Sequence, residues 1–129
     1  MNEPACPFCT LAPQRVLISS PFGIVFRDAF PVSPGHTLVI PRRHVRSFFD
    51  LNRDEIESLL ALLDGAKKAT DVELTPDGYN IGINDGPAAG QTVSHLHIHL
   101  IPRYLGDKAD PRGGVRWMFP DKADYWTKR

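Results

Sequence analysis

The stretch "QTVSHLHIHLIPR", residues 91–103, places a histidine at every second position of its central part. We expect a strand over residues 92–102. Since the side chains of a strand alternate between its two faces, the histidines should share one face, and the apolar residues between them should point into a core. The first set is His95, His97 and His99, and the second is Leu96, Ile98 and Leu100.

The rest of the chain predicts an antiparallel sheet with one long helix. Short apolar runs predict further strands over residues 23–28, 36–41 and 79–84. A helix should run from about residue 53 to residue 72, because Asn52 can cap it and Glu55 occupies the capping-box position. With a short helix or turn over residues 42–51, the pattern indicates the α+β class. The expected core-facing stripe of the long helix is Ile56, Leu59, Leu60, Leu63 and Ala66.

Length and charge restrict the kind of protein this is. A chain of 129 residues corresponds to one domain, 1–129, which can bury a core without disulfides. The 15 basic and 15 acidic residues balance, so the charge gives no case for nucleic acid or an anionic membrane as a partner. No apolar run is long enough to span a membrane and the first residues do not resemble a secretory signal, so we expect a cytoplasmic location.

The alternating histidines allow two kinds of chemistry. One is metal binding, although the outer two of three alternate imidazoles lie too far apart to hold one ion together. The other is nucleophilic catalysis, because neutral imidazole attacks near neutral pH and a neighbouring histidine can fix its tautomer or protonate a leaving group. The preceding loop, "NDGPAAGQT", favours the second, since its small residues let backbone N–H groups approach a phosphate.

A pair of cysteines, Cys6 and Cys9, lies near the start of the chain. In a cytosolic protein this spacing is more often a metal or redox site than a structural disulfide. A closed zinc site needs four cysteine or histidine ligands, and the remaining candidates are His36, His44 and the alternating histidines. A reduced pair of thiols without a metal is the alternative.

The motif "HLHIHLI" resembles the signature of the histidine triad (HIT) superfamily. The similarity continues through "FRDAFPVSPGHTLVIPRRHV", the long helix and "NDGPAAGQTVSHLHIHLIPRYLGD", and covers about residues 6–107. The loop and the triad are most similar to the fragile-histidine-triad branch, which cleaves dinucleoside polyphosphates. The resemblance implies a HIT-like fold and a homodimer whose two sheets join, with residues 108–129 as a C-terminal tail.

The resemblance also implies roles for individual residues. His97 would attack the α-phosphorus of a nucleotide, and water would then release the nucleoside monophosphate. The backbone carbonyl of His95 would fix the tautomer of His97, Asp28 would bind the ribose, and Phe26 would line the base pocket. For His36 a structural role is expected. The implied catalytic residues are His95, His97, His99 and Gln91, and the implied substrate-binding residues are Phe26, Asp28, Asn84, Gly90, Gln91, Thr92 and His99.

A zinc ion is implied by the resemblance to bacterial members of the superfamily that carry the cysteine pair. Its ligands would be Cys6, Cys9, His44 and His95. Four protein ligands leave no open position, so the zinc would be structural and would connect the start of the chain to the sheet beside the active site.

The expected function is therefore hydrolysis of a dinucleoside polyphosphate or a related purine nucleotide through a nucleotidyl-histidine intermediate. Two alternatives stay open: a nucleoside phosphoramidase, and a nucleotide-binding regulatory module with weak turnover. The tail is rich in Pro, Gly and charge, and its aromatic residues suggest that it docks against a surface. Its Arg112 and Arg116 could reach phosphates, although a solvated tail is the simpler expectation.

Overall fold

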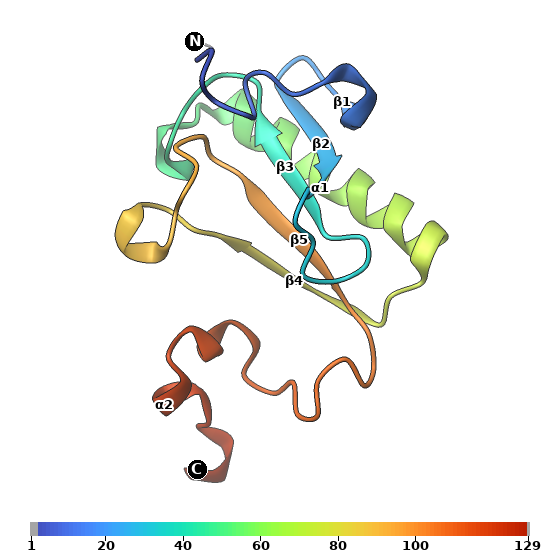
Figure 1. Cartoon of the computed structure of the whole chain (residues 1–129), viewed down its shortest axis with the longest axis vertical. Coiled ribbons are helices and arrows are strands. Elements are labelled where there is room, and N and C mark those ends of the chain that lie inside the picture. The colour runs from blue at the N-terminus through green and yellow to red at the C-terminus, as the bar shows by residue number, and fades with distance from the viewer. Residues whose placement is uncertain (1–2, 129) are drawn as a thin grey trace.

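Five strands form one antiparallel sheet in this computed structural model, which describes residues 3–128 (Figure 1). The strands lie in the order β1-β2-β3-β5-β4, so β3 is central and β5 lies between β3 and β4. The predicted α+β class is confirmed, with α1 (Arg53–Leu74) as the long helix and α2 (Pro120–Ala123) as a short one. The strands are β1 (Val16–Ser19), β2 (Gly23–Arg27), β3 (Thr37–Pro41), β4 (Gly78–Ile83) and β5 (Ile98–Arg103).

The histidine segment joins the sheet later than the sequence predicts. Strand β5 begins at Ile98, which pairs with Val39 of β3, so His95 and His97 lie before the paired part. The reason is that the backbone N–H of Leu96 donates to the carbonyl of Val45 at 2.7 Å, in the loop after β3, instead of to a strand. The alternation of faces is nevertheless confirmed, because all three predicted core residues are buried: Leu96, Ile98 and Leu100.

The other predicted strands are confirmed to within one residue at each end, but β1 was not predicted. It is a short edge strand in which half-buried and exposed residues alternate, and its pairing with β2 is irregular between Val16 and Ile18. Such a strand has little apolar pattern to detect. Within residues 42–51 the expected short helix is one turn of 3₁₀-helix over Phe48–Asp50, capped by the side chain of Ser47.

Helix α1 has the predicted capping box, in which Asn52 and Glu55 satisfy each other's backbone N–H groups. Its predicted stripe is wrong at one position, because Leu60 is 53% exposed. The buried stripe runs instead through Leu59, Leu62 and Ala66, which successive turns of the helix align. These residues pack closely on β2, where a Cβ at Gly23 would lie 2.7 Å from side-chain atoms of both Leu59 and Leu62.

The two faces of the sheet are covered differently. One face packs against α1 and contains the main core, which includes the three buried residues of the histidine segment. The other face has a smaller cluster of Phe26, Leu38 and Ile40, covered by Phe8 and Leu11 from the N-terminal segment. The N-terminal segment includes the cysteine pair, and the rest of this second face is free for a site.

The C-terminal tail folds mainly on itself, away from the sheet (Figure 1). Arg112 lies over the Trp126 ring and pairs with Asp110, and Arg116 lies over the Tyr125 ring and donates to backbone carbonyls of the tail. The two arginines therefore do not line the pocket described below. Among the described residues, no helix is long and apolar enough to cross a membrane.

Adjacent leucines of α1 allow a test of the packing. We expect Leu59→Ala to lower the free energy of unfolding by about 2–5 kcal/mol, because its fully buried side chain would leave a cavity against β2. Leu60→Ala, one residue later and half exposed, should change it by no more than about 0.5 kcal/mol. Urea unfolding followed by circular dichroism measures both, and equal losses would contradict the assigned helix face.

Candidate active site

A pocket of about 470 Å³ opens on the face of the sheet opposite α1, and we call it the His97 pocket. It is bounded by the N-terminal segment, β2, the loop between β2 and β3, and the histidine segment. Six of the predicted residues line it: Phe26, Asp28, Asn84, Thr92, His97 and His99. Sequence reasoning gave no site role to several others: Phe8, Arg15, Phe30 and Val32. None of these four belongs to a chemical motif by its own side chain, and only the fold brings them to the pocket.

The imidazole of His97 has a defined tautomer. Its Nδ1 lies 2.8 Å from the carbonyl oxygen of His95, and a carbonyl only accepts, so Nδ1 carries the proton. The lone pair is therefore on Nε2. The Phe8 ring packs edge-on against this imidazole, with 5.2 Å between ring centroids. His97 is thus held on two sides, in the orientation in which its neutral imidazole carries the lone pair on Nε2.

His36 fixes the tautomer of His99 in the same way. The backbone N–H of Val32 donates to Nδ1 of His36 at 3.1 Å, so the proton of His36 is on Nε2. That N–H lies 2.9 Å from Nδ1 of His99, which must accept, and the proton of His99 is left on its Nε2. A carboxylate oxygen of Asp28 lies 3.4 Å from the same nitrogen of His36. His36, for which a structural role was expected, thus sets the hydrogen-bonding state of a triad member.

The imidazoles of His36 and His99 are both neutral at physiological pH. Burial lowers the pKa of His99 to about 4, and the neighbouring His97 and His36 add to the effect. Burial also lowers the pKa of His36, although the carboxylate of Asp28 opposes this. A neutral His99 is a hydrogen-bond donor through Nε2 and adds no charge of its own.

Gln91 determines the conformation of the loop 84–92, which we call the glycine loop. Its side-chain oxygen accepts from the N–H of Gly86 at 2.8 Å, and its amide nitrogen donates to the carbonyls of Arg46 and Val93, both at 3.0 Å. Gly90 has a φ of 94°, a conformation that other residues rarely adopt. Gln91, Gly90 and His95 do not line the pocket, whereas Thr92 and Asn84 belong to its wall.

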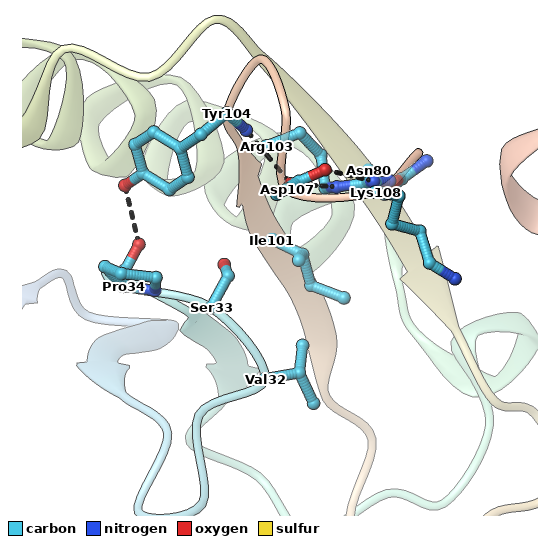
Figure 2. A pocket seen from close by; sticks show the side chains of 9 residues that line it. All are labelled: Val32, Ser33, Pro34, Asn80, Ile101, Arg103, Tyr104, Asp107 and Lys108. Atoms are coloured by element: carbon cyan, nitrogen blue, oxygen red, sulfur yellow. Dashed lines mark hydrogen bonds and ion pairs between the residues drawn. The ribbon is translucent and has the colours of Figure 1, made fainter. Parts of the chain in front are cut away.

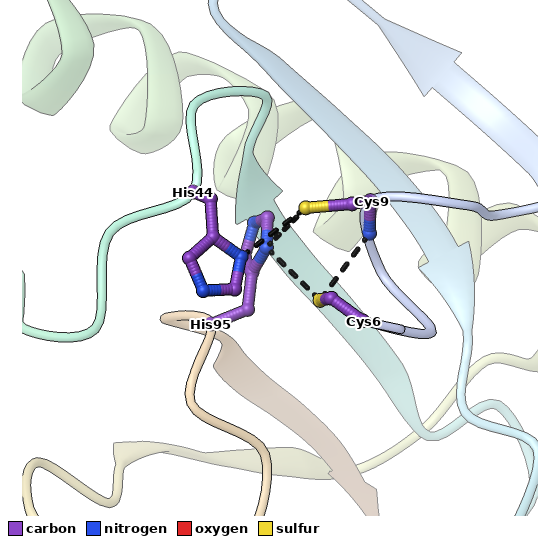
Figure 3. Close-up of side chains that lie close together, drawn as sticks. All are labelled: Cys6, Cys9, His44 and His95. Atoms are coloured by element: carbon purple, nitrogen blue, oxygen red, sulfur yellow. Dashed lines mark hydrogen bonds between the residues drawn. The ribbon is translucent and has the colours of Figure 1, made fainter. Parts of the chain in front are cut away.

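The first histidine of the triad, His95, belongs to a separate cluster, which we call the metal-ligand cluster. It contains the four residues predicted to hold zinc: Cys6, Cys9, His44 and His95 (Figure 3). Their ligand atoms all lie within 4.8 Å of one another. Sγ of Cys9 is 3.2 Å from Nδ1 of His44 and 3.5 Å from Nδ1 of His95, and Sγ of Cys6 is 3.5 Å from the latter. A tetrahedral zinc with ordinary bond lengths separates sulfur from nitrogen by about 3.6 Å, so the spacing suits that ion.

The protonation of this cluster also suits a metal. Nε2 of His95 lies 2.8 Å from the carbonyl oxygen of Pro41 and must donate to it, which leaves the Nδ1 lone pair toward the cysteines. Burial lowers the pKa of His95 and so keeps it neutral. Burial and the adjacent Cys6 raise the pKa of the Cys9 thiol. A thiolate there needs a nearby cation, and a bound metal ion supplies one.

The metal-ligand cluster and the His97 pocket share the segment 6–9. Phe8 lies between the two cysteines, and its ring contacts the rings of Phe26, His95 and His97, with centroids 5.4, 5.9 and 5.2 Å apart. The conformation of the cysteine loop therefore determines where one wall of the pocket lies.

Comparison with known proteins agrees with this geometry. An uncharacterized HIT-like protein of Methanocaldococcus jannaschii is 41% identical over 108 residues, which cover 79% of this chain and 81% of that protein. A bis(5'-adenosyl)-triphosphatase of Saccharomyces cerevisiae is 33% identical over 127 residues, which cover 98% of this chain and 59% of the yeast protein.

Solved structures show the same fold. The crystal structure of a zinc-bound histidine triad family protein from Mycobacterium smegmatis has a TM-score of 0.73 and 36% sequence identity, and the match covers 82% of this chain and 80% of that one. Residues 10–106 also match the HIT domain family. The histidine signature, the fold and these matches agree, and the chain belongs to the histidine triad (HIT) family.

Proposed function

We propose that the protein hydrolyses dinucleoside polyphosphates through a covalent intermediate on His97. The observation that carries this proposal is the hydrogen bond from Nδ1 of His97 to the carbonyl of His95, which places the lone pair of the neutral imidazole on Nε2, at a pocket able to hold a nucleotide. The similarity to the yeast bis(5'-adenosyl)-triphosphatase supports this class of substrate. "GQT" before the triad supports a polyphosphate leaving group over the amine of a phosphoramidate.

The reaction would take place in two displacements. In the first, Nε2 of His97 forms a bond to the α-phosphorus while the bond from phosphorus to the bridging oxygen breaks, and the leaving nucleotide keeps the electron pair. The carbonyl of His95 stabilises the positive charge that develops on the imidazole. In the second, water attacks the phosphorus, the phosphorus–nitrogen bond breaks, and a nucleoside monophosphate and one proton leave.

Other residues of the pocket would position the nucleotide. His99 would donate from Nε2 to a phosphoryl oxygen, and Thr92 and Asn84 would add polar contacts. Asp28 would accept hydrogen bonds from the ribose hydroxyls. A purine base would lie toward the apolar side of the pocket, where Phe8 contacts Phe26 and the guanidinium of Arg15 lies 5.2 Å from the centre of the Phe26 ring. Gln91 and Gly90 would contribute by holding the glycine loop in its conformation.

We also propose a structural zinc held by Cys6, Cys9, His44 and His95. The donor set and spacing fit, and the zinc-bound relative from Mycobacterium smegmatis supports the identity of the ion. When bound, the ion supplies a positive charge that stabilises two thiolates, and four protein ligands complete its coordination. The two free cysteines also fit the cytoplasmic location that we propose, since reduced thiols are typical of that compartment.

A homodimer joined through β4 is a further part of the proposal. Strand β4 is at the edge of the sheet, and Ile81 on it is 51% exposed. An unpaired strand edge with an apolar side chain is a ready template for a second copy.

The central test replaces the nucleophile. We expect His97→Asn to lower the rate of AMP release from diadenosine triphosphate by about 10⁴-fold or more, because among residues 3–128 no other pocket group has its side-chain lone pair assigned to the attack on the α-phosphorus. The variant should still bind AMP, since the other pocket contacts remain. Chromatography of the products and calorimetric titration measure the two quantities. Wild-type protein that binds AMP but releases none from diadenosine tri- or tetraphosphate would refute the hydrolase and favour a binding module.

The state of His99 gives a second test, by NMR of the imidazole nitrogens across a pH titration. We expect a neutral Nε2–H tautomer that is protonated only near pH 4. Because this pKa lies below the unfolded value of about 6.5, the folded state binds fewer protons than the unfolded chain between these values. The contribution of His99 to stability is therefore intact above about pH 6.5 and is lost as the pH falls toward 4.

Two variants of His36 separate its role from simple packing. His36→Leu should let His99 populate both tautomers and should lower kcat more than it raises KM. His36→Gln, whose amide can donate to Nδ1 of His99, should restore the Nε2–H tautomer. If His99 has the same NMR tautomer in the wild type and in His36→Leu, the proposed role of His36 is wrong.

Zinc content gives a third test. We expect elemental analysis to find about one zinc per chain in the wild type and almost none in Cys9→Ser, in which a hydroxyl replaces a thiolate ligand. Cys9→Ser should also melt at a lower temperature and bind AMP more weakly, because the loop that positions Phe8 is no longer fixed. His97→Asn is the matched control and should keep its zinc, since His97 lies beside the ligand set without belonging to it. Full zinc in Cys9→Ser would contradict the assignment.

A further inference from the structure

A second pocket, drawn in Figure 2, lies on the same face of the sheet as the His97 pocket. It has a volume of about 450 Å³ and lies between the loop 32–34 and the adjoining ends of β4 and β5. Val32 lines both pockets, so they adjoin. Nothing in the proposed binding of the first nucleotide uses this second pocket.

Strand β5 leads directly from one pocket to the other. Its residues alternate between buried and partly exposed, and the partly exposed ones are His99, Ile101 and Arg103. Ile101 and Arg103 therefore continue the row of His97 and His99 on the same face. The rise of a strand places Ile101 about 7 Å beyond His99. A phosphate chain that extends from the α-phosphorus along β5 would enter the second pocket.

The walls of the second pocket suit a nucleotide. Arg103 forms an ion pair with Asp107 at 2.8 Å, so the charges of these two residues cancel. Arg103 also donates a hydrogen bond to Asn80. Lys108 takes part in none of the ion pairs between described residues, which leaves the pocket with one net positive charge. Val32 and Ile101 supply apolar surface, and the Tyr104 ring is held by a hydrogen bond from its hydroxyl to the carbonyl of Pro34 at 2.8 Å.

We propose that the second pocket binds the leaving half of the substrate, a nucleoside di- or triphosphate joined through its terminal phosphate to the α-phosphate held at His97. Its phosphates would lie near Lys108, and its nucleoside would contact Ile101 and Tyr104. The assignment rests on the proposed hydrolase function and makes the pocket a determinant of substrate class. Substrates with a small leaving group would use the His97 pocket alone.

The test compares two substrates that share the AMP half. Diadenosine tetraphosphate fills both pockets, and adenosine 5'-phosphoramidate fills only the first. We expect Lys108→Glu to lower the ratio of their kcat/KM values by about 5-fold, because a charge that attracts phosphate becomes one that repels it. Ile101→Trp, which fills the pocket without changing its charge, should lower the same ratio. Lys122→Glu, an equal charge change on the tail outside both pockets, should leave the ratio unchanged.

The outcomes separate the subsite from the function. An unchanged ratio in Lys108→Glu and Ile101→Trp, or an equal loss with both substrates, would overturn the subsite. If the wild-type protein hydrolyses neither substrate, the proposed function fails, and binding then decides the subsite. If the subsite exists, the wild type must then bind diadenosine tetraphosphate with a lower dissociation constant than AMP. In Lys108→Glu the two dissociation constants must become equal. Equal dissociation constants for the two ligands would reject the second pocket.

Discussion

His95 makes three interactions on which the rest of the site depends. Its Nε2 donates to the carbonyl of Pro41 at the end of β3, its Nδ1 faces the two cysteines, and its own carbonyl accepts from His97. One fully buried residue therefore joins the sheet, the cluster of possible metal ligands and His97. The bond to Pro41 determines that the Nδ1 lone pair faces the cysteines, because an imidazole that donates from one nitrogen offers a lone pair on the other. The backbone carbonyl of His95 in turn determines the tautomer of the neutral His97 ring.

A second series of hydrogen bonds fixes tautomers beside His97. The N–H of Val32 sets the proton of His36, and His36 sets the proton of His99. Burial makes this arrangement stable, because it lowers the pKa of His36 and His99 and so disfavours the charged forms that would disrupt it. The pocket is left with the His97 lone pair on Nε2 beside the neutral donor His99, which is the combination that the proposed attack on the α-phosphorus needs.

The division of the sheet into two faces makes such a site possible in so short a chain. Helix α1 covers one face and provides the main core, in which Leu96, Ile98 and Leu100 hold the histidine segment in position. The second face is covered only in part, by Phe8 and its neighbours from the cysteine loop. The zinc that we propose would hold this small cover in place where apolar burial is limited. Beyond it, the uncovered sheet has room for the two adjoining pockets that we assign to the two halves of a substrate.

The sequence by itself determined the fold class, the helix with its capping box, the core-facing alternation of the histidine segment and, through its resemblance to the HIT family, the four Cys and His residues that cluster as possible metal ligands. These features depend on local periodicity or on a motif whose residues lie close together in the chain. The start of β5 was predicted too early and Leu60 was assigned to the wrong face, because a long-range hydrogen bond and the packing direction of α1 decide them. The link from His36 to His99, the place of Phe8 on His97 and the second pocket follow only from the tertiary structure. Each brings together residues from distant parts of the chain, and no local pattern encodes which groups will meet.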